Sequence, residues 1–157
     1  MAVKITKASL KDGRGIANVL VKSYNIKDIM EGVDVFKNET SRQYHYIIAE
    51  DRGKVIGLAT WVMHGLPKHE LFELDRIAVL PEYRGKWVSK KLFHALVKDA
   101  KLFYRKHKLK ARKLYLMTHA DNTRAQKFYE KLGFRHETTL KEHYYQGKDE
   151  LVYSMFF

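Results

Sequence analysis

Residues 73–92 read ELDRIAVLPEYRGKWVSKKL, the most informative stretch of the chain. An apolar strand is predicted over residues 71–80, a Pro-initiated loop follows, and Arg84-Gly85-Lys86 leads into a long helix. The first-turn N–H groups of that helix have no partner within it and face the loop. Gly85 allows a ligand close to the backbone, while Arg84 and Lys86 contribute positive charge. The stretch therefore predicts a site for a phosphorylated ligand.

Hydrophobic periodicity on both sides of this stretch predicts an alternation of strands and helices. Strands are expected over residues 3–8, 44–50, 55–64, 71–80, 113–119, 135–145 and 150–157, and helices over residues 10–27, 87–107 and 123–132. Residues 28–43 are ambiguous, and we expect a short helix and a loop there. Asn122 or Thr123 is expected to cap the third helix, and Gly133 to end it. This order predicts an α+β fold in a single domain over residues 1–157.

The composition excludes several functional classes. The chain has no Cys, which excludes disulfides, thiolate nucleophiles and Cys-based zinc sites. Its eight His form neither a His-x-x-x-His pair nor a tight cluster, so we expect no metal site. No apolar run reaches the roughly 18 residues that span a bilayer, and the N-terminal residues lack an apolar signal-peptide core. We therefore expect a cytoplasmic protein with no membrane partner.

The charge is strongly positive. A formal net charge of +12 attracts phosphates, nucleic acid or acidic proteins, although solubility alone explains it equally well. Residues 98–113 (KDAKLFYRKHKLKARK) contain eight Lys and Arg and are compatible with nucleic-acid binding. A solvated helix end and loop is the interpretation that the sequence favours, because cations also stabilise a helix C-terminus.

A second informative segment, residues 122–134, reads NTRAQKFYEKLGF. It predicts a capped helix that carries Tyr129 and closes through Leu-Gly-Phe into a strand. Together with residues 71–92, it resembles the GNAT superfamily of acyl-CoA-dependent N-acyltransferases. The resemblance implies a central, mostly antiparallel, splayed sheet flanked by helices. It also implies acetyl-CoA as the acyl donor and a primary amine as the acceptor.

The resemblance gives the residues around both segments a role in cofactor binding. The pantetheine arm is expected to pair with the strand backbone at Ile77 and Val79, where a backbone N–H also polarises the thioester carbonyl. The diphosphate is expected against residues 84–89, and Asn122 matches a residue that commonly contacts the cofactor. The residues expected to bind acetyl-CoA are Ile77, Ala78, Val79, Arg84, Gly85, Lys86, Trp87, Val88, Ser89, Lys90, Asn122, Ala125 and Phe128.

Trp87 and Ser89 depart from the family pattern. That pattern usually has Gly or Ala at the first of these positions and often Gly at the second. A Trp does not adopt a positive φ cheaply, and its side chain fills space near the phosphates. We therefore expect either ordinary helical angles at Trp87 or a cofactor that sits slightly differently.

The expected catalytic residues are two carboxylates and a phenol. Glu73 is the expected base, because it matches a position where several family members carry a catalytic Glu that deprotonates the amine. Asp75 lies two residues on, hence on the same strand face, and the two carboxylates would raise each other's pKa and attract a cationic amine. Tyr129 matches the Tyr that commonly protonates the departing thiolate, and packing beneath the final hairpin is its alternative role.

The sequence does not identify the acceptor. A protein N-terminus, a lysine side chain and a small amine all remain open. Tyr24, Phe36, Tyr144 and Tyr145 are candidates to line the acceptor slot, although core packing explains them about as well. A non-catalytic module that binds acyl-CoA or nucleic acid through its basic face is the alternative function. A homodimer is also left open.

Overall fold

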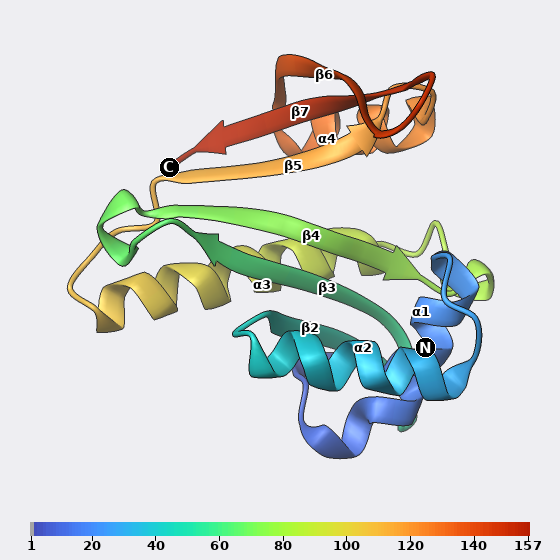
Figure 1. Ribbon diagram of the computed structural model, residues 1–157. Helices are drawn as coiled ribbons and strands as arrows, with labels where there is room; N and C mark the ends of the chain where they lie inside the picture. The colour runs from blue at the N-terminus through green and yellow to red at the C-terminus, as the bar shows by residue number, and fades with distance from the viewer. Residues whose placement is uncertain (1) are drawn as a thin grey trace.

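The computed structural model describes residues 2–157, in which one seven-stranded sheet is flanked by four α-helices (Figure 1). The strands are β1 (Val3–Lys7), β2 (His45–Asp51), β3 (Lys54–His64), β4 (Leu71–Val79), β5 (Lys113–His119), β6 (Arg135–Tyr145) and β7 (Lys148–Phe156). The helices are α1 (Gly13–Ser23), α2 (Ile29–Ser41), α3 (Val88–Lys106) and α4 (Thr123–Leu132). The sheet order is β1-β2-β3-β4-β5-β7-β6, and β4–β5 is the parallel pair. The predicted α+β class and mostly antiparallel sheet are confirmed.

The helices cover both faces of the sheet. α1 and α2 pack against each other on one face, and α3 crosses β1 to β4 on the opposite face (Figure 1). The apolar side of α3, including Leu92 and Leu96, is buried against Trp61 and Phe72, which forms the main core. The Trp61 indole N–H donates to the Asp99 carboxylate at 2.9 Å, so this buried polar group has a partner.

The sheet splits between β4 and β5. The two strands pair only where Leu71–Glu73 runs beside Lys113–Tyr115, and they then diverge (Figure 1). A β-bulge in β4 leaves Asp75 opposite no residue of β3, because Leu74 pairs with Trp61 and Arg76 with Thr60. The split therefore leaves an unpaired strand edge in the middle of the sheet.

Two early segments differ from the prediction. Residues 28–43, where we expected a short helix and a loop, contain the 13-residue helix α2, and Asp28 caps it by accepting from the Glu31 N–H at 2.9 Å. Gly32 disfavours a helix locally, but α2 needs it to approach α1, since a Cβ there would lie 2.8 Å from the Ala17 Cβ. The helix expected over residues 10–27 is shorter: a 3₁₀ turn precedes α1, which ends at Ser23.

The later segments agree closely with the prediction. β5 and α4 have the expected bounds, and Asn122 caps α4 because its side-chain oxygen accepts from the Ala125 N–H at 3.2 Å. Gly133 ends α4 with a φ of 105°, in the left-handed region that a glycine adopts most easily. Within residues 2–157, no helix has both the length and the apolar character needed to cross a bilayer.

Candidate active site

The unpaired edge of β4 presents the backbone of Ile77 and Val79. Because the Leu80 N–H donates to Ile56 of β3, the alternate residues turn their N–H and C=O groups to the open side. The Tyr24 hydroxyl donates to the Ile77 carbonyl at 3.3 Å, and the Arg84 side chain donates to the Val79 carbonyl at 3.2 Å. Ala78, which we also expected at the cofactor, has its backbone turned toward β3. The edge offers an extended ligand two backbone N–H groups.

The loop after β4 supplies a cradle of N–H groups. Gly85 has a φ of 73°, and nothing lies within 4 Å of where its Cβ would be, so the backbone is open to a ligand. The first hydrogen bond across the start of α3 runs from the Lys91 N–H to the Trp87 carbonyl, so the N–H groups of Val88, Ser89 and Lys90 have no partner within the helix. Three exposed cations surround them: Arg84, Lys86 and Lys90. This loop fits a diphosphate.

Trp87 adopts the conformation that we expected it to avoid. Its φ is 66° and its ψ is 4°, in the left-handed region, so the expectation of ordinary helical angles is wrong. The side chain is 70% exposed, and the Lys90 ammonium lies 5.4 Å from the ring centroid. Trp87 therefore makes a left-handed turn at a position where the family pattern usually has Gly or Ala, and α3 begins at the next residue.

Tyr129 and Tyr24 approach each other near the split. Tyr129 comes from α4, and Phe134, which follows the helix, packs against it edge-on with ring centroids 5.9 Å apart. Burial raises the pKa of Tyr129 to about 12, so its hydroxyl is protonated at neutral pH. Burial, followed by the nearby Tyr129, raises the pKa of Tyr24 as well. No residue among 2–157 hydrogen-bonds the Tyr129 hydroxyl, which leaves it available to a ligand.

Glu73 carries two hydrogen-bonding neighbours that the sequence did not reveal. The His64 Nε2 lies 2.6 Å from the Glu73 Oε2, and the Tyr115 hydroxyl donates to the same oxygen at 3.3 Å. Tyr115 stands beside Glu73 in the parallel register, while His64 comes from the end of β3. Neither partner has a local signal, because strand pairing alone brings these residues together. One oxygen of the expected base is therefore engaged.

Asp75 is less engaged than Glu73. Its nearest cation is the Arg76 guanidinium at 3.8 Å, but Arg76 is bonded to Glu39 of α2, with a shorter distance of 2.7 Å to Oε2. Burial raises the pKa of Asp75 to about 6, Arg76 opposes this, and Glu39 and Glu73 add to it. We expected Glu73 and Asp75 on the same face of the strand because side chains alternate along it, and the bulge at Asp75 interrupts that alternation. Glu73 is nevertheless close enough to raise the pKa of Asp75.

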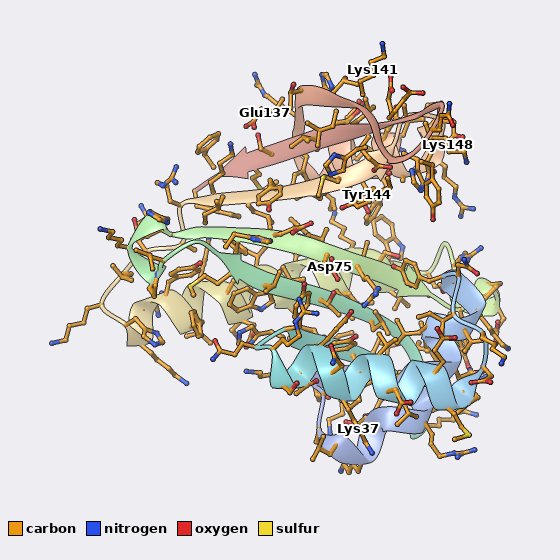
Figure 2. The ribbon with its side chains drawn as sticks, in the orientation of Figure 1. Lys37, Asp75, Glu137, Lys141, Tyr144 and Lys148 are labelled. Carbon is orange, nitrogen blue, oxygen red and sulfur yellow. The ribbon has the colours of Figure 1, made fainter. Side chains whose placement is uncertain are left out.

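Tyrosines surround the two carboxylates. Burial, together with nearby Asp75 and Glu73, raises the pKa of both Tyr44 and Tyr144. Figure 2 shows Tyr144 extending from the β6–β7 hairpin toward β4, where Asp75 lies. Phe36, by contrast, is 2% exposed and packs edge-on against Tyr46, and it lines a hollow that contains neither carboxylate.

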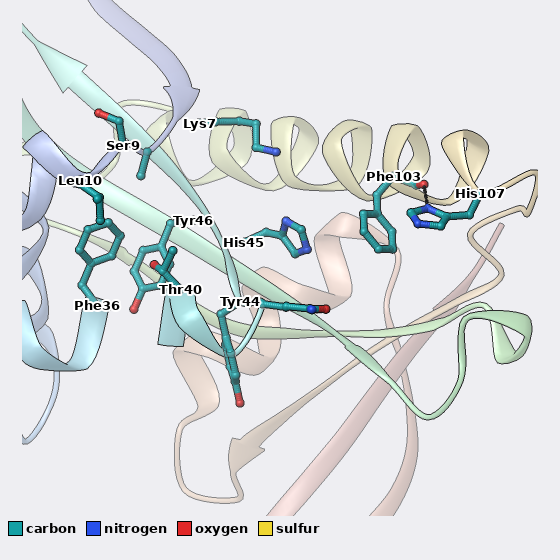
Figure 3. A pocket seen from close by; sticks show the side chains of 12 residues that line it. Lys7, Ser9, Leu10, Phe36, Thr40, Tyr44, His45, Tyr46, Phe103 and His107 are labelled. Atoms are coloured by element: carbon teal, nitrogen blue, oxygen red, sulfur yellow. Dashed lines mark hydrogen bonds between the residues drawn. The ribbon is translucent and has the colours of Figure 1, made fainter. Parts of the chain in front are cut away.

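Other expected site residues lie at the border of this region. The Tyr145 ring lies tilted beside His119, with centroids 6.0 Å apart, and the His119 Nδ1 contacts the carboxylate of the buried Glu150. Phe128 is on α4 and lines a separate shallow hollow. A larger hollow of about 610 Å³ lies near the C-terminal ends of α2 and α3, and its lining includes Tyr44 but neither carboxylate nor Tyr129 (Figure 3). The candidate site is thus the open split itself.

A family model matches more than half of the chain. Residues 42–136 match the model described as an acetyltransferase (GNAT) domain. The match includes β4, the loop that joins it to α3, α3 itself, β5 and α4, which are the elements that form the candidate site. No curated protein matches the chain by sequence.

Solved structures share the fold along nearly the whole chain. A GNAT-family protein of Desulfovibrio desulfuricans is 20% identical, with a TM-score of 0.81 and 99% of both chains covered. The ribosomal-protein-S18-alanine N-acetyltransferase of Escherichia coli is 18% identical, with a TM-score of 0.78 over 99% of this chain and 94% of that chain. YncA of Salmonella typhimurium, solved with its cofactor acetyl-CoA, is 16% identical, with a TM-score of 0.74 over the same shares. The chain belongs to the GNAT acetyltransferase family.

Proposed function

We propose that this protein is an N-acetyltransferase that moves the acetyl group of acetyl-CoA directly to a primary amine in a ternary complex. The observation that carries the proposal is the open edge of β4, which runs into a loop of unpaired N–H groups and lies beside two carboxylates and a partly buried phenol. We also propose that residues 1–157 form a single domain, which would contain the whole of the matched range.

The cofactor would extend along β4. Its pantetheine amides would pair with the backbone of Ile77 and Val79, and its diphosphate would accept hydrogen bonds from the first turn of α3, with Arg84 and Lys86 nearby. Acetyl-CoA would supply the activated acetyl group. The acetyl-CoA complex of the structurally similar YncA supports this choice of donor.

Side chains of the site would transfer a proton at two steps, from the amine before it attacks and to the thiolate as it leaves. The amine would lose a proton to Asp75 or Glu73, and its nitrogen would then attack the thioester carbon. We favour Asp75, because Arg76, its one ion-pair partner among residues 2–157, lies 3.8 Å away and is bonded to Glu39, and because its raised pKa of about 6 suits a base near neutral pH. As the carbon–sulfur bond breaks, Tyr129 would give its proton to the thiolate.

The acceptor is a primary amine of a protein N-terminus, a lysine side chain or a small molecule. Glu73 and Asp75 would attract its ammonium form, and Tyr44 and Tyr144 lie close enough to them to add aromatic surface beside the cation. The ribosomal-protein N-acetyltransferase of Escherichia coli, similar in fold, supports a peptide amine as the first to test.

A thiol-release assay with acetyl-CoA and an amine panel tests the function, and Tyr129→Phe tests the mechanism. We expect acetyl-CoA to be consumed only with an amine present, and the variant to lose at least roughly 10²-fold in kcat while its KM for acetyl-CoA stays similar. Tyr153→Phe is the matched control, because that hydroxyl is bonded to Glu130 outside the site.

Two outcomes would contradict this proposal. Full turnover by Tyr129→Phe would return Tyr129 to a packing role. Stabilisation by acetyl-CoA without thiol release on any amine would instead favour a non-catalytic acyl-CoA-binding module.

A further inference from the structure

Nearly all of the net positive charge lies in one continuous part of the chain. Between Lys86 and Lys113 there are eleven Lys and Arg but only one acidic residue, Asp99, which gives a formal charge of +10 out of the total of +12. This part contains α3 and the segment that connects it to β5. The remaining chain is close to neutral, so the positive field has a definite origin on the surface.

Five cations of α3, together with His94, share its outer side. We call this the basic face of α3, and it consists of the exposed residues Lys91, His94, Lys98, Lys101, Arg105 and Lys106. Successive members are mostly three or four residues apart, which places them roughly 5 Å apart along the helix axis. The opposite side of the helix is buried against the sheet. The face is therefore a row of positive charge along a rigid element.

No acidic side chain compensates this row. Asp99 is turned inward and only 13% exposed, because its carboxylate accepts from the Trp61 indole at 2.9 Å and pairs with Lys7 at 3.2 Å. Among residues 2–157, no ion pair involves a member of the basic face of α3. Cations elsewhere do have partners, as in Lys54–Glu82 and Lys113–Glu137.

We propose that the basic face of α3 binds the phosphodiester backbone of a nucleic acid. Lys and Arg that neutralise phosphates supply most of the affinity in such complexes, and they do not require a particular base sequence. An acidic protein is a poorer fit, because a protein interface needs an apolar centre, whereas the large apolar side chains exposed on α3 are Leu102 and, at its start, Trp87, which are far apart along the helix. The sequence alone favoured a solvated helix, but it did not show that every member of the basic face of α3 is exposed and takes part in no ion pair within residues 2–157.

Binding at this face would leave the two carboxylates of the candidate active site open. α3 lies on the side of the sheet opposite α1 and α2, whereas Asp75 and Glu73 interact with groups on the α2 side (Figure 1). A polyanion would also be repelled by these carboxylates. The inference does not depend on acetyl transfer, so either can fail without the other.

Fluorescence anisotropy with labelled 20-nucleotide single-stranded RNA, duplex RNA and duplex DNA tests the inference, with the full chain and no acetyl-CoA. We expect binding to duplex DNA at 50 mM salt that weakens by roughly 10²- to 10³-fold at 200 mM, as about five phosphate contacts require. The RNA arms show which nucleic acid is preferred.

The triple variant Lys98→Gln, Arg105→Gln, Lys106→Gln should bind at least roughly tenfold more weakly, with the salt slope for duplex DNA reduced by about three. The matched control is Lys4→Gln, Lys11→Gln, Lys37→Gln, which removes the same charge from exposed positions away from α3; Figure 2 shows Lys37 on α2. Both variants are checked by thermal unfolding.

Three results would overturn the inference. The first is no binding to any of the three nucleic acids at 50 mM salt. The second is an equal loss in the control variant, which would mean that net charge rather than this face is responsible. The third is equally tight binding of poly-glutamate at the same salt, which would indicate an acidic protein as the partner.

Discussion

At the scale of single residues, Trp87 combines two unfavourable features. A non-glycine residue in the left-handed region costs about 1–2 kcal/mol, and Trp87 has a φ of 66°. Its indole is 70% exposed, so burial within the chain offsets little of that cost. Strain of this kind is kept where a ligand uses the backbone, and Trp87 adjoins the N–H groups that we assign to the diphosphate.

Replacing Trp87 by Gly should therefore raise the free energy of unfolding by about 1 kcal/mol in the absence of ligand. Gly85→Ala is the opposite test. Gly85 has a φ of 73° and empty space around its Cβ position, so the variant should lose about 1 kcal/mol of unfolding free energy through backbone strain alone. Urea unfolding monitored by circular dichroism measures both. A clear loss of stability in Trp87→Gly would show that the indole packs more than its exposure indicates.

If Asp75 is the base, its pKa predicts the shape of the pH profile of kcat. Only the ionised carboxylate accepts a proton, so kcat should rise about tenfold per pH unit below pH 6 and level off above it, following the pKa of about 6. Asp75→Asn should abolish this acid limb together with most of the turnover. If Glu73→Gln removes the limb and Asp75→Asn does not, Glu73 is the base. The measurement is a kcat profile from pH 5 to 8.

The pKa of Asp75 also predicts the direction in which its contribution to folding stability changes with pH. Its folded pKa lies above its ordinary value of 3.8, so the folded protein binds the proton more tightly than the unfolded chain. The contribution of Asp75 is therefore most favourable below about pH 4 and is lost as pH rises through 6. The melting temperature of Asp75→Asn relative to the native protein should rise over that window.

At the scale of elements, β4 has two different edges. One edge is paired with β3 along its length, while the other is paired with β5 only at Leu71–Glu73. Backbone N–H groups beyond that point have no strand partner, although they lie in the middle of the sheet. Such an edge invites pairing with an added strand or with an extended amide-containing ligand.

Amide hydrogen exchange followed by NMR can measure this difference within one strand. Without cofactor, the Ile77 and Val79 amides should exchange quickly, and acetyl-CoA should slow them at least roughly tenfold. Ala78 and Leu80 are the internal controls, because their amides face β3 and should be protected in both states. Slow exchange at Ile77 and Val79 without cofactor would mean that the split is closed in solution.

At the scale of the whole molecule, the uneven charge sets up a long-range field. The excess of positive charge lies on and beyond α3, whose N-terminal end forms part of the proposed diphosphate site. The two carboxylates, Glu73 and Asp75, interact with groups on the face of the sheet opposite α3. An anionic donor and a cationic amine would therefore be attracted to opposite faces of the sheet.

The association rate of acetyl-CoA should depend on salt for this reason. Between 20 and 200 mM NaCl the Debye length falls from roughly 20 Å to below 10 Å, and we expect the on-rate to drop roughly tenfold. Stopped-flow fluorescence of Trp87 provides the signal. Acetyl-pantetheine, which lacks the phosphates, is the control and should show a nearly flat salt dependence; an equal drop for both ligands would exclude electrostatic steering.

The sequence alone determined the elements whose signals are local. The alternating apolar residues of 113–119, the cap at Asn122 and the stop at Gly133 depend on nearest neighbours along the chain, and the structure has them where they were expected. The strand–loop–helix unit around Gly85 was recognisable for the same reason. These features need no knowledge of what packs against them.

Only the tertiary structure decided which side chains meet. His64 and Tyr115 reach Glu73 through strand register, and α2 forms because Gly32 can approach Ala17 of α1. The bulge at Asp75, and hence its distance from compensating charge, also follows from pairing between strands. Such contacts join residues far apart in sequence, and their free energy depends on register and burial, which no local pattern encodes.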